Sequence, residues 1–377
     1  MPGFELIGKE EHDELNHLMN SSSILFRHGF DGLRNGVYKV RDFEKAFAEK
    51  MRSENALAVS SGTAALLVAL KAFGIGKGDE VITQSFTFVA TVEAIVEAGA
   101  SPVIAEIDHS LNISPEAIEE LITPATKAII VVHMLGIPVD MDKVNRIAKK
   151  YNLYVIEDTA WGCGGRLNNQ SLGTLSDAGT YSFDFAKTMT TGEGGMVVFK
   201  DHQFFQKAAA YHDHGHENNP DFPRWEDTRS STGFNYRMSE LQGAIGLAQL
   251  RKLDGIVTSQ RFNAKRIADS LVSKGYKLRE KPNNSYETSD AVVFFCQNAY
   301  EAVWTREKLL KVGISTKILP EAISWHFAGS WDHIPEIKNF DSTNRFALSH
   351  AILSKTVAIP IFVNMEESFF EKIEQVL

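Results

Sequence analysis

Apolar and polar positions change their period repeatedly between about residue 40 and residue 200. The stretch "ENALAVSSGTAALLVALKAFGIGKGDEVIT" predicts a strand, a turn, an apolar helix, a glycine-rich loop and a second strand. The runs "SPVIAEID" and "AIIVVHML" follow as predicted strands, with the helical pattern "SPEAIEELI" between them. Farther on, "MDKVNRIAKKYNLYVIED" predicts a helix that leads into another strand. Strands that alternate with helices predict an α/β fold with a mostly parallel central sheet, covered by helices on both faces.

The second half of the chain opens with a stretch that has no clear period. Residues 212–235 are polar and aromatic, which predicts a long loop that is either functional or disordered. The stretch "MSELQGAIGLAQLRKLDGIVTSQRFNAKRIADSLVSKG" then predicts a long helix that leads to a smaller C-terminal α/β lobe. Because 377 residues exceed what one hydrophobic core usually serves, we expect two domains. We assign residues 1–250 to a large domain with an N-terminal segment and residues 251–377 to a smaller one.

The composition narrows the class of protein. Hydrophobic residues make up 44% of the chain and charged residues 23%, which is typical of a globular protein. A net charge of −9 argues against a general affinity for nucleic acid or for anionic membranes. The N-terminal stretch "MPGFELIGKEEHDELN" has acids where a secretion signal has bases, and Cys163 and Cys296 are too few for a disulfide framework. We therefore expect a soluble cytoplasmic protein.

Three small or hydroxylated residues lie between a predicted strand and a predicted helix. These residues, Ser61, Gly62 and Thr63, precede the apolar pattern "AALLVAL". Free backbone N–H groups at a helix N-terminus, together with two hydroxyls, suit a phosphate group. The alternative interpretation is an ordinary helix cap without a ligand.

An acidic residue ends one of the predicted buried strands. Asp158, in "YVIEDTAWG", lies where open α/β sheets bind their ligands. A carboxylate there needs a partner, because the burial of an unpaired charge is costly. That partner could be a protonated ring nitrogen of a ligand, or an arginine or lysine of the protein.

A lysine stands among small and hydroxylated residues in "GTYSFDFAKTMTTGEGGMVVF". Lys187 lies in a turn-like segment ahead of a predicted strand, with Ser182 nearby as a possible hydroxyl donor. The glycines of "TTGEGG" allow the backbone to approach a ligand closely. A lysine that forms a Schiff base must be close to a carbonyl and deprotonated when it attacks. The alternative interpretation is a tight surface turn that happens to contain a lysine.

Three histidines alternate in "HDHGH". On a strand, His212, His214 and His216 would point to one face, so a metal site has to be considered. The segment lies in a predicted loop and lacks a convincing fourth ligand, so we expect no metal. One or two of these histidines could instead line the mouth of a pocket.

The order of these features on one α/β scaffold is more specific than any one of them. A phosphate site is followed by an aromatic strand end, an acid and then a lysine. That order suits pyridoxal 5′-phosphate (PLP), whose pyridinium nitrogen needs an acid and whose aldehyde needs a lysine.

Several motifs resemble those of a known family. The stretches "SSGTAAL", "SFTFVATVEAI", "VIED", "YSFDFAKTMTTGEGG" and "GFNYRMSELQGAIGLAQLRKLD" are similar to those of the DegT/DnrJ/EryC1/StrS sugar aminotransferases, over about residues 30 to 330. The resemblance implies the fold-type I PLP aminotransferase architecture and a homodimer with shared active sites. It also implies transfer of an amino group from L-glutamate to a keto or aldehyde sugar, often a nucleotide-linked one.

The resemblance assigns a role to each matching residue. Lys187 would form the internal aldimine with the cofactor and later move a proton between carbon atoms. Asp158 would pair with the pyridinium nitrogen, and Phe88 would stack on the face of the ring. The residues implied to hold the phosphate are Gly62, Thr63 and Ser182, with Asn235 of the neighbouring subunit reaching across. His214, in the motif "HG", and Arg237, in "NYR", match residues near the substrate.

Two stretches depart from the family's pattern. The chain has "EDTAW" where the family usually has "EDAAQ", so that Trp161 replaces a glutamine near the cofactor. A tryptophan offers one N–H and no acceptor, which alters the hydrogen bonding and the volume of the pocket. The stretch "VVHMLGIPVDMD" likewise replaces the common "HLYGQPADMD". These departures concern the substrate more than the cofactor.

Other stretches point to one subgroup of the family. The opening "MPGFELIG", the "DHGH" loop and "LPEAISWHFAGSWDH" look most like the 8-amino-3,8-dideoxy-manno-octulosonate transaminases. The resemblance to that subgroup implies amination of an oxidised eight-carbon acid sugar for lipopolysaccharide. Two alternatives belong to other classes: a PLP-dependent sugar dehydratase and a non-catalytic PLP-binding regulator on the same fold. The dehydratases of the family carry histidine in place of the lysine, so Lys187 argues against the first.

Overall fold

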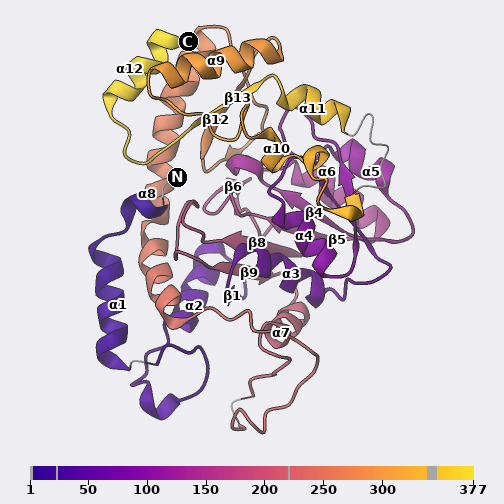
Figure 1. Cartoon of the computed structure of the whole chain (residues 1–377). Helices are drawn as coiled ribbons and strands as arrows, with labels where there is room; N and C mark the ends of the chain where they lie inside the picture. Colours follow the sequence, from indigo (N-terminus) through magenta and orange to yellow (C-terminus); the bar gives the residue numbers. More distant parts are fainter. Residues whose placement is uncertain (1–2, 23, 220, 338–345) are drawn as a thin grey trace.

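The computed structural model describes residues 3–22, 24–219, 221–337 and 346–377 (Figure 1). Its α-helices are α1 (Lys9–Ser21), α2 (Lys39–Met51), α3 (Gly62–Ala72), α4 (Ala90–Glu97), α5 (Pro115–Leu121), α6 (Met141–Tyr151), α7 (His202–Tyr211), α8 (Glu240–Ser273), α9 (Ala299–Lys311), α10 (Ile323–His326), α11 (Ala347–Leu353) and α12 (Glu367–Val376). Short 3₁₀ helices are η1 (Gly3–Leu6), η2 (Asp31–Leu33), η3 (Met134–Gly136), η4 (Ala328–Ser330) and η5 (Pro335–Ile337). The strands are β1 (Leu57–Val59), β2 (Glu80–Gln84), β3 (Ser101–Ala105), β4 (Thr126–Val132), β5 (Tyr154–Asp158), β6 (Arg166–Leu167), β7 (Gln170–Ser171), β8 (Ala178–Ser182), β9 (Gly195–Phe199), β10 (Lys277–Leu278), β11 (Ser285–Tyr286), β12 (Ala291–Phe295) and β13 (Thr356–Pro360).

The central sheet contains seven strands among the described residues, in the order β1-β9-β8-β5-β4-β2-β3. The strands from β8 to β3 in this order pair in parallel, whereas β9 is antiparallel to both of its neighbours. Parallel strands are buried on both faces, and β4 accordingly ends in the apolar run AIIVV, while β5 begins with YVI ahead of its two acids. The predicted α/β fold with a mostly parallel sheet is confirmed.

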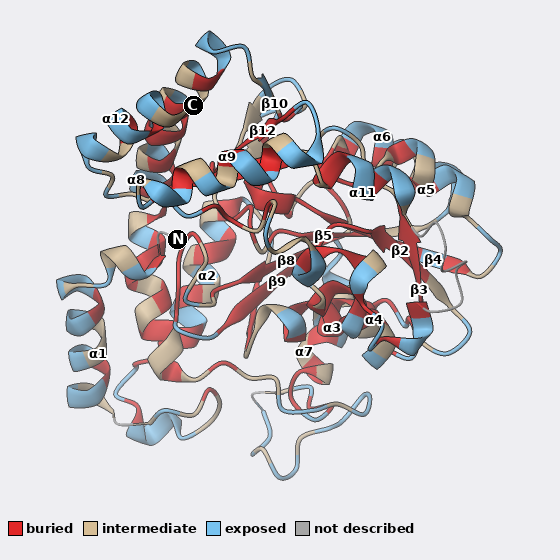
Figure 2. Cartoon of the chain, turned by 45° about the horizontal axis from the view of Figure 1, so that its top comes forward, coloured by how far each residue is buried: buried red, intermediate tan, exposed pale blue. Residues whose placement is uncertain are grey.

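Helices cover both faces of this sheet. Figure 2 shows the strands buried between helices that are themselves partly exposed. Successive residues of a strand point to opposite faces, so Ile130 of β4 packs in the core that contains α3. Its neighbours Ile129 and Val131 enter a different core, which contains residues of α5 and α6. The α3 helix contacts α4, α7, β8 and β9, and the side chains of most of its residues are buried. Such a helix is apolar nearly all round because protein encloses it.

A smaller antiparallel sheet, in the order β10-β12-β13, lies toward the C-terminus. It shares a hydrophobic core with the second half of α8 and with α9 and α12. The α8 helix begins at a capping box, in which the Ser239 hydroxyl accepts from Gln242 N and Gln242 Oε1 accepts from Ser239 N. Figure 1 shows it running from α2 in the large part of the molecule to α9 and α12. The division at residue 250 stays a prediction, and α8 crosses it.

The segment between α7 and α8 matches the predicted long loop. Outside residue 220, it contains only isolated bridges, such as those of Asp213 with Asn235 and His216 with Arg229. In Figure 1 this segment extends below α7. Across the described ranges, none of the helices combines the length and the apolar character that a bilayer crossing requires. Both cysteines, Cys163 and Cys296, are buried and free.

Candidate active site

A cavity of about 120 Å³ lies at the carboxyl ends of the parallel strands. Its wall includes Asp158, the last residue of β5, and Ser182, the last residue of β8. The first residues of α3 and the segment after β2 complete this part of the wall. Ligands of open α/β sheets bind at this edge. The predicted site residues that line this cavity are Gly62, Thr63, Phe88, Asp158, Trp161, Ser182 and Lys187.

The N-terminus of α3 forms one end of the cavity. Ser61 caps the helix, because its Oγ accepts from Ala64 N at 3.0 Å. A Cβ atom at Gly62 would lie 2.7 Å from the Ser182 Cβ, so a side chain at residue 62 would collide with β8. Glycine therefore brings the first turn of α3 against the end of β8, where backbone N–H groups and hydroxyls converge. This arrangement suits the phosphate of PLP.

Asp158 lies at the other end, and its side chain is almost fully buried. Its Oδ2 accepts from the Thr91 hydroxyl at 2.9 Å, and its Oδ1 accepts from Ala160 N at 3.1 Å. Burial raises the pKa of the Asp158 carboxyl, although the hydrogen bonds from Ala160 and Thr91 oppose the shift. No ion pair of Asp158 with a basic side chain is found among the described residues. A protonated ring nitrogen would supply the missing cation, so the carboxylate fits the pyridinium of PLP.

Lys187 lies in the turn between β8 and β9. Its N–H donates to Asp184 O at 3.1 Å, which closes the turn, and its Nζ lies 3.9 Å from the centre of the Trp161 ring. Burial lowers the pKa of the Lys187 amine, although the carboxylates of Asp158 and Asp184 oppose the shift. The positive charge of Lys317 adds to the lowering. A neutral amine is the form that attacks an aldehyde.

The N-terminal segment forms a backbone hydrogen bond with the turn that contains Lys187. Gly3 N donates to Lys187 O at 2.9 Å. A Cβ atom at Gly3 would lie 2.7 Å from the same oxygen, so only glycine allows this approach. No local sequence pattern indicates this contact, because Gly3 and Lys187 lie far apart in the chain.

Two aromatic side chains form the walls between these ends. Phe88 follows β2 and is 40% exposed, so its ring has a face available for stacking. Trp161 is buried, and its ring contacts the Lys187 amine. The Trp161 carbonyl accepts from the Thr288 hydroxyl at 2.9 Å, which ties this wall to the segment that leads into β12.

Among the polar residues at or near the cavity that no sequence motif assigned are Thr91, Lys317 and His326. Thr91 donates to Asp158, and its hydroxyl also lies 2.9 Å from the Thr87 hydroxyl. The spacing of four residues in "TFVAT" could have indicated this pair, since such residues share one face at a helix start. Lys317 and His326 come from the C-terminal part of the chain and carry no local signal of this kind.

Asn235, His214 and Arg237 do not line this cavity in the single chain. Arg237 bonds to the buried carboxylate of Asp213, which also accepts two hydrogen bonds from Arg224. Burial acts to raise the pKa of the Asp213 carboxyl, but these arginines outweigh burial, so that the pKa is lowered. His214 is exposed and has a positive φ of 55°. The predicted role of Asn235 requires a neighbouring subunit, and the roles of Asn235, His214 and Arg237 all stay predictions.

The three alternating histidines have separate surroundings. His212 Nδ1 contacts the Ala209 carbonyl at 2.5 Å, and His216 Nδ1 contacts Asp227 at 3.1 Å. Throughout the described ranges, no group of three or more His, Cys, Asp and Glu side chains could hold a metal ion.

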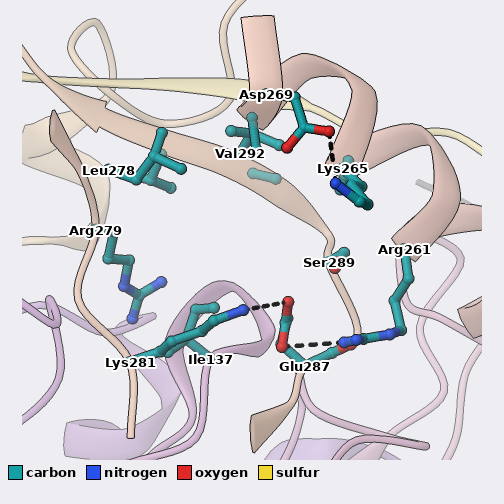
Figure 3. A pocket seen from close by; sticks show the side chains of 14 residues that line it. Ile137, Arg261, Lys265, Asp269, Leu278, Arg279, Lys281, Glu287, Ser289 and Val292 are labelled. Carbon is teal, nitrogen blue, oxygen red and sulfur yellow. Dashed lines mark hydrogen bonds and ion pairs between the residues drawn. The ribbon is translucent and has the colours of Figure 1, made fainter. Parts of the chain in front are cut away.

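A larger cavity, of about 350 Å³, lies between α8 and the small sheet (Figure 3). Figure 3 shows Lys281 and Arg261 both pointing toward Glu287, and Lys265 pointing toward Asp269. Its lysines therefore have acidic partners, whereas the smaller cavity around Lys187 contains a buried acid without a basic one. The residues that line the smaller cavity fit a PLP site better.

Comparisons with known proteins agree with this geometry. Residues 10–377 match the model of the DegT/DnrJ/EryC1/StrS aminotransferase family. The chain is 36% identical to a GDP-perosamine synthase of Escherichia coli O157:H7 over 316 residues. This matched region covers 83% of this chain and 82% of that protein. It is 39% identical over 256 residues to the spore coat polysaccharide biosynthesis protein SpsC of Bacillus subtilis, over 66% of this chain and 63% of that one.

Solved structures show the same architecture. The aminotransferase from Psychrobacter cryohalolentis superposes with a TM-score of 0.86 at 30% identity, over 98% of this chain and 96% of that one. A 3-amino-5-hydroxybenzoic acid synthase superposes with a TM-score of 0.84 at 25% identity, over 100% of this chain and 97% of that one. The chain therefore belongs to the DegT/DnrJ/EryC1/StrS aminotransferase family and is a PLP-dependent enzyme of the sugar aminotransferase type.

Proposed function

We propose that this enzyme transfers an amino group from L-glutamate to a keto or aldehyde sugar for bacterial surface polysaccharide or lipopolysaccharide synthesis. The acceptor would be a nucleotide-linked sugar or 8-oxo-3,8-dideoxy-octulosonate. The GDP-perosamine synthases among the relatives favour the first, and the motifs "DHGH" and "LPEAISWHFAGSWDH" favour the second.

The observation that carries the proposal is one cavity with an amine of lowered pKa and a buried acid that lacks a basic partner. When bound, PLP supplies an aldehyde that takes up the amino group and a ring that accepts electrons. The α3 N-terminus and the Ser182 hydroxyl would hold its phosphate, and Asp158 would keep its ring nitrogen protonated. Phe88 would cover the face of the ring.

Lys187 would then move the proton of the reaction. Its neutral Nζ can accept a proton from the α-carbon of glutamate, because burial disfavours the charged ammonium. The same group, once protonated, can return the proton to another carbon. Trp161 would exclude water from this side of the amine, since its ring lies directly beside Nζ.

Glutamate alone tests the first half of the reaction. Purified holoenzyme mixed with L-glutamate should convert its cofactor to the pyridoxamine form within minutes, as followed by absorption. Addition of keto sugars from both classes, with detection of the aminated product by mass spectrometry, identifies the acceptor. A holoenzyme whose spectrum does not respond to L-glutamate, while another amino acid converts it, would contradict the proposed donor.

A further inference from the structure

A second lysine lies against the wall of the active site. Lys317 Nζ lies 4.8 Å from the centre of the Trp161 ring, whose distance from Lys187 Nζ is 3.9 Å. Two amines therefore approach one indole, and only Lys187 has a role in the proposed transamination. Lys317 lies on the segment that approaches the small sheet, where its N–H donates to Ala358 O of β13 at 2.8 Å.

Lys317 is held in this position by an acid. Its Nζ pairs with the Oδ2 atom of Asp290, and the side chains of both residues are largely buried. Asp290 directly precedes β12, and Thr288 beside it donates to the Trp161 carbonyl. The ion pair thus belongs to the same group of contacts as the cavity wall. An ammonium group has three N–H donors, and Asp290 is the one hydrogen-bond acceptor found for it among the described residues.

Stability alone is a poor explanation for this pair. The removal of two charges from water costs about as much as their attraction returns, and apolar replacements of buried pairs are often neutral. A buried cation beside a reacting amine is better explained by an anion that binds there. The enzyme acts on small polar molecules, and a carboxylate is the anionic group of the proposed donor.

His326 provides a second, independent observation. Its imidazole is 8% exposed, and within the part of the chain that the structure describes its buried Nδ1 has no hydrogen-bond partner. The ring lies 5.6 Å from the Phe88 ring and 6.4 Å from the Trp161 ring, so it adjoins both aromatic walls of the cavity. Burial and the charges of Lys187 and Lys317 lower its pKa to about 4. A neutral imidazole at neutral pH has one N–H, which can donate to an anion.

We infer that Lys317 and His326 form a subsite, beside Trp161, that binds the carboxylate of a substrate. Lys317 supplies the charge, Asp290 positions it, and His326 supplies a neutral hydrogen-bond donor. This inference rests on the proposed transamination, and it identifies a carboxylate as the group that is recognised. That carboxylate comes either from the amino donor or from an acid sugar acceptor.

The test compares two variants of the holoenzyme. Asp290→Asn removes the acid and keeps the cation, whereas Lys317→Met/Asp290→Asn removes both charges. The dissociation constant of glutarate, a dicarboxylate that has no amino group to transfer, is measured by calorimetry. We expect it to rise at least tenfold in the double variant and to stay within threefold of the wild type in Asp290→Asn. A merely structural pair would make the two variants behave alike, and that result would overturn the inference.

The two half-reactions identify the source of the carboxylate. A tenfold rise in the apparent dissociation constant of L-glutamate, with an unchanged limiting rate, assigns the subsite to the donor. An unchanged glutamate reaction, with a tenfold loss for a carboxylated keto sugar but not for a neutral one, assigns it to the acceptor. Equal binding of both carboxylates by the double variant and the wild type overturns the inference.

Matched controls separate this result from loss of the fold. Lys39→Met removes another buried lysine that is paired with an acid, Glu14 at 2.6 Å, and should leave glutarate binding unchanged. If Asp290→Asn does not fold, Lys317→Arg serves as the variant that keeps the charge. Glutarate binding needs no turnover, so a failure of the proposed transamination would be visible separately.

Discussion

The cavity around Lys187 and the segment from 212 to 237 show two ways in which polar residues are held. In the cavity, Asp158 is buried without a basic partner, and the Lys187 amine lies beside an indole. In the segment, Asp213 is equally buried, but Arg224 and Arg237 neutralise it. The acid of the first region therefore lacks a basic partner, which a ligand could supply. The acid of the second region already has basic partners within its own segment. The residues proposed to bind the cofactor lie at strand ends of one chain, whereas the predicted role of Asn235, in the segment, requires a neighbouring subunit.

The largest effect is expected from loss of the amine. Lys187→Ala should reduce the turnover rate at least about 10⁴-fold, since it removes both the group that bonds to the cofactor and the proton carrier. Steady-state kinetics measure this effect, and the absorption of the bound cofactor should change with it. Lys143→Ala, at an exposed lysine, is the control and should retain full activity. Wild-type turnover in Lys187→Ala would remove the lysine from the mechanism.

Asp158→Asn should slow the glutamate half-reaction roughly hundredfold, which corresponds to the loss of about 3 kcal/mol from a charge-assisted hydrogen bond. Rapid-mixing absorption measures the rate. The variant should fold without the cofactor, because burial already disfavours the charged form of Asp158. An unchanged rate would contradict the proposed role of Asp158 in keeping the ring nitrogen protonated.

Asn235 tests whether the second region acts in a neighbouring subunit. Asn235→Ala should weaken PLP binding about tenfold, in line with one lost hydrogen bond to a charged group. A mixed dimer contains one Asn235→Ala subunit and one Lys187→Ala subunit. If each site combines Lys187 of one subunit with Asn235 of the other, one of its two sites is intact. At a PLP concentration that leaves the weakened Asn235→Ala sites largely empty, refolding of an equal mixture should raise the activity to about a quarter of the wild-type value, by the statistics of random pairing. No recovery, in a mixture shown to contain hybrid dimers, would mean that the sites are not shared.

Gly62 tests the close approach of α3 to β8. Gly62→Ala should lower the free energy of unfolding by about 1–3 kcal/mol, because its Cβ would collide with Ser182. Chemical denaturation measures this change, and PLP affinity should fall in parallel. Gly255→Ala, on an exposed turn of α8 with nothing within 4 Å of the added Cβ, should instead gain up to about 1 kcal/mol. Equal effects of the two variants would contradict the proposed collision.

Each region also contains a buried histidine, and acid should affect both. Burial lowers the pKa of His212 to about 3, and burial with the nearby lysines lowers that of His326 to about 4. The unfolded chain binds a proton near pH 6.5 and the folded chain does not, so stability falls as the pH drops below 6.5. At pH 5 each histidine should cost about 2 kcal/mol relative to pH 7. His212→Gln should flatten the pH dependence of the thermal midpoint; an unchanged slope would contradict the assignment.

The sequence predicted the residues of the cavity that belong to local motifs. Asp158 ends an apolar strand, Gly62 follows another, and Lys187 precedes a third, so each position could be assigned from its neighbours. The parallel sheet then brings these strand ends together. Lys317 and His326 could not be found in this way, because α10 and the chain before it reach the cavity only through tertiary contacts such as that of Thr87 N with His326 O. The sequence pattern also gives no sign of a domain boundary, since α8 continues without a break through residue 250.

The contact of Gly3 with the Lys187 carbonyl has a practical consequence for anyone who handles this enzyme. Whatever is fused ahead of residue 3 emerges next to the turn that carries Lys187. An affinity tag there could press on that turn and depress activity without loosening the remainder of the protein. A tag beyond α12, which packs on the small sheet instead, is the safer design for kinetic measurements.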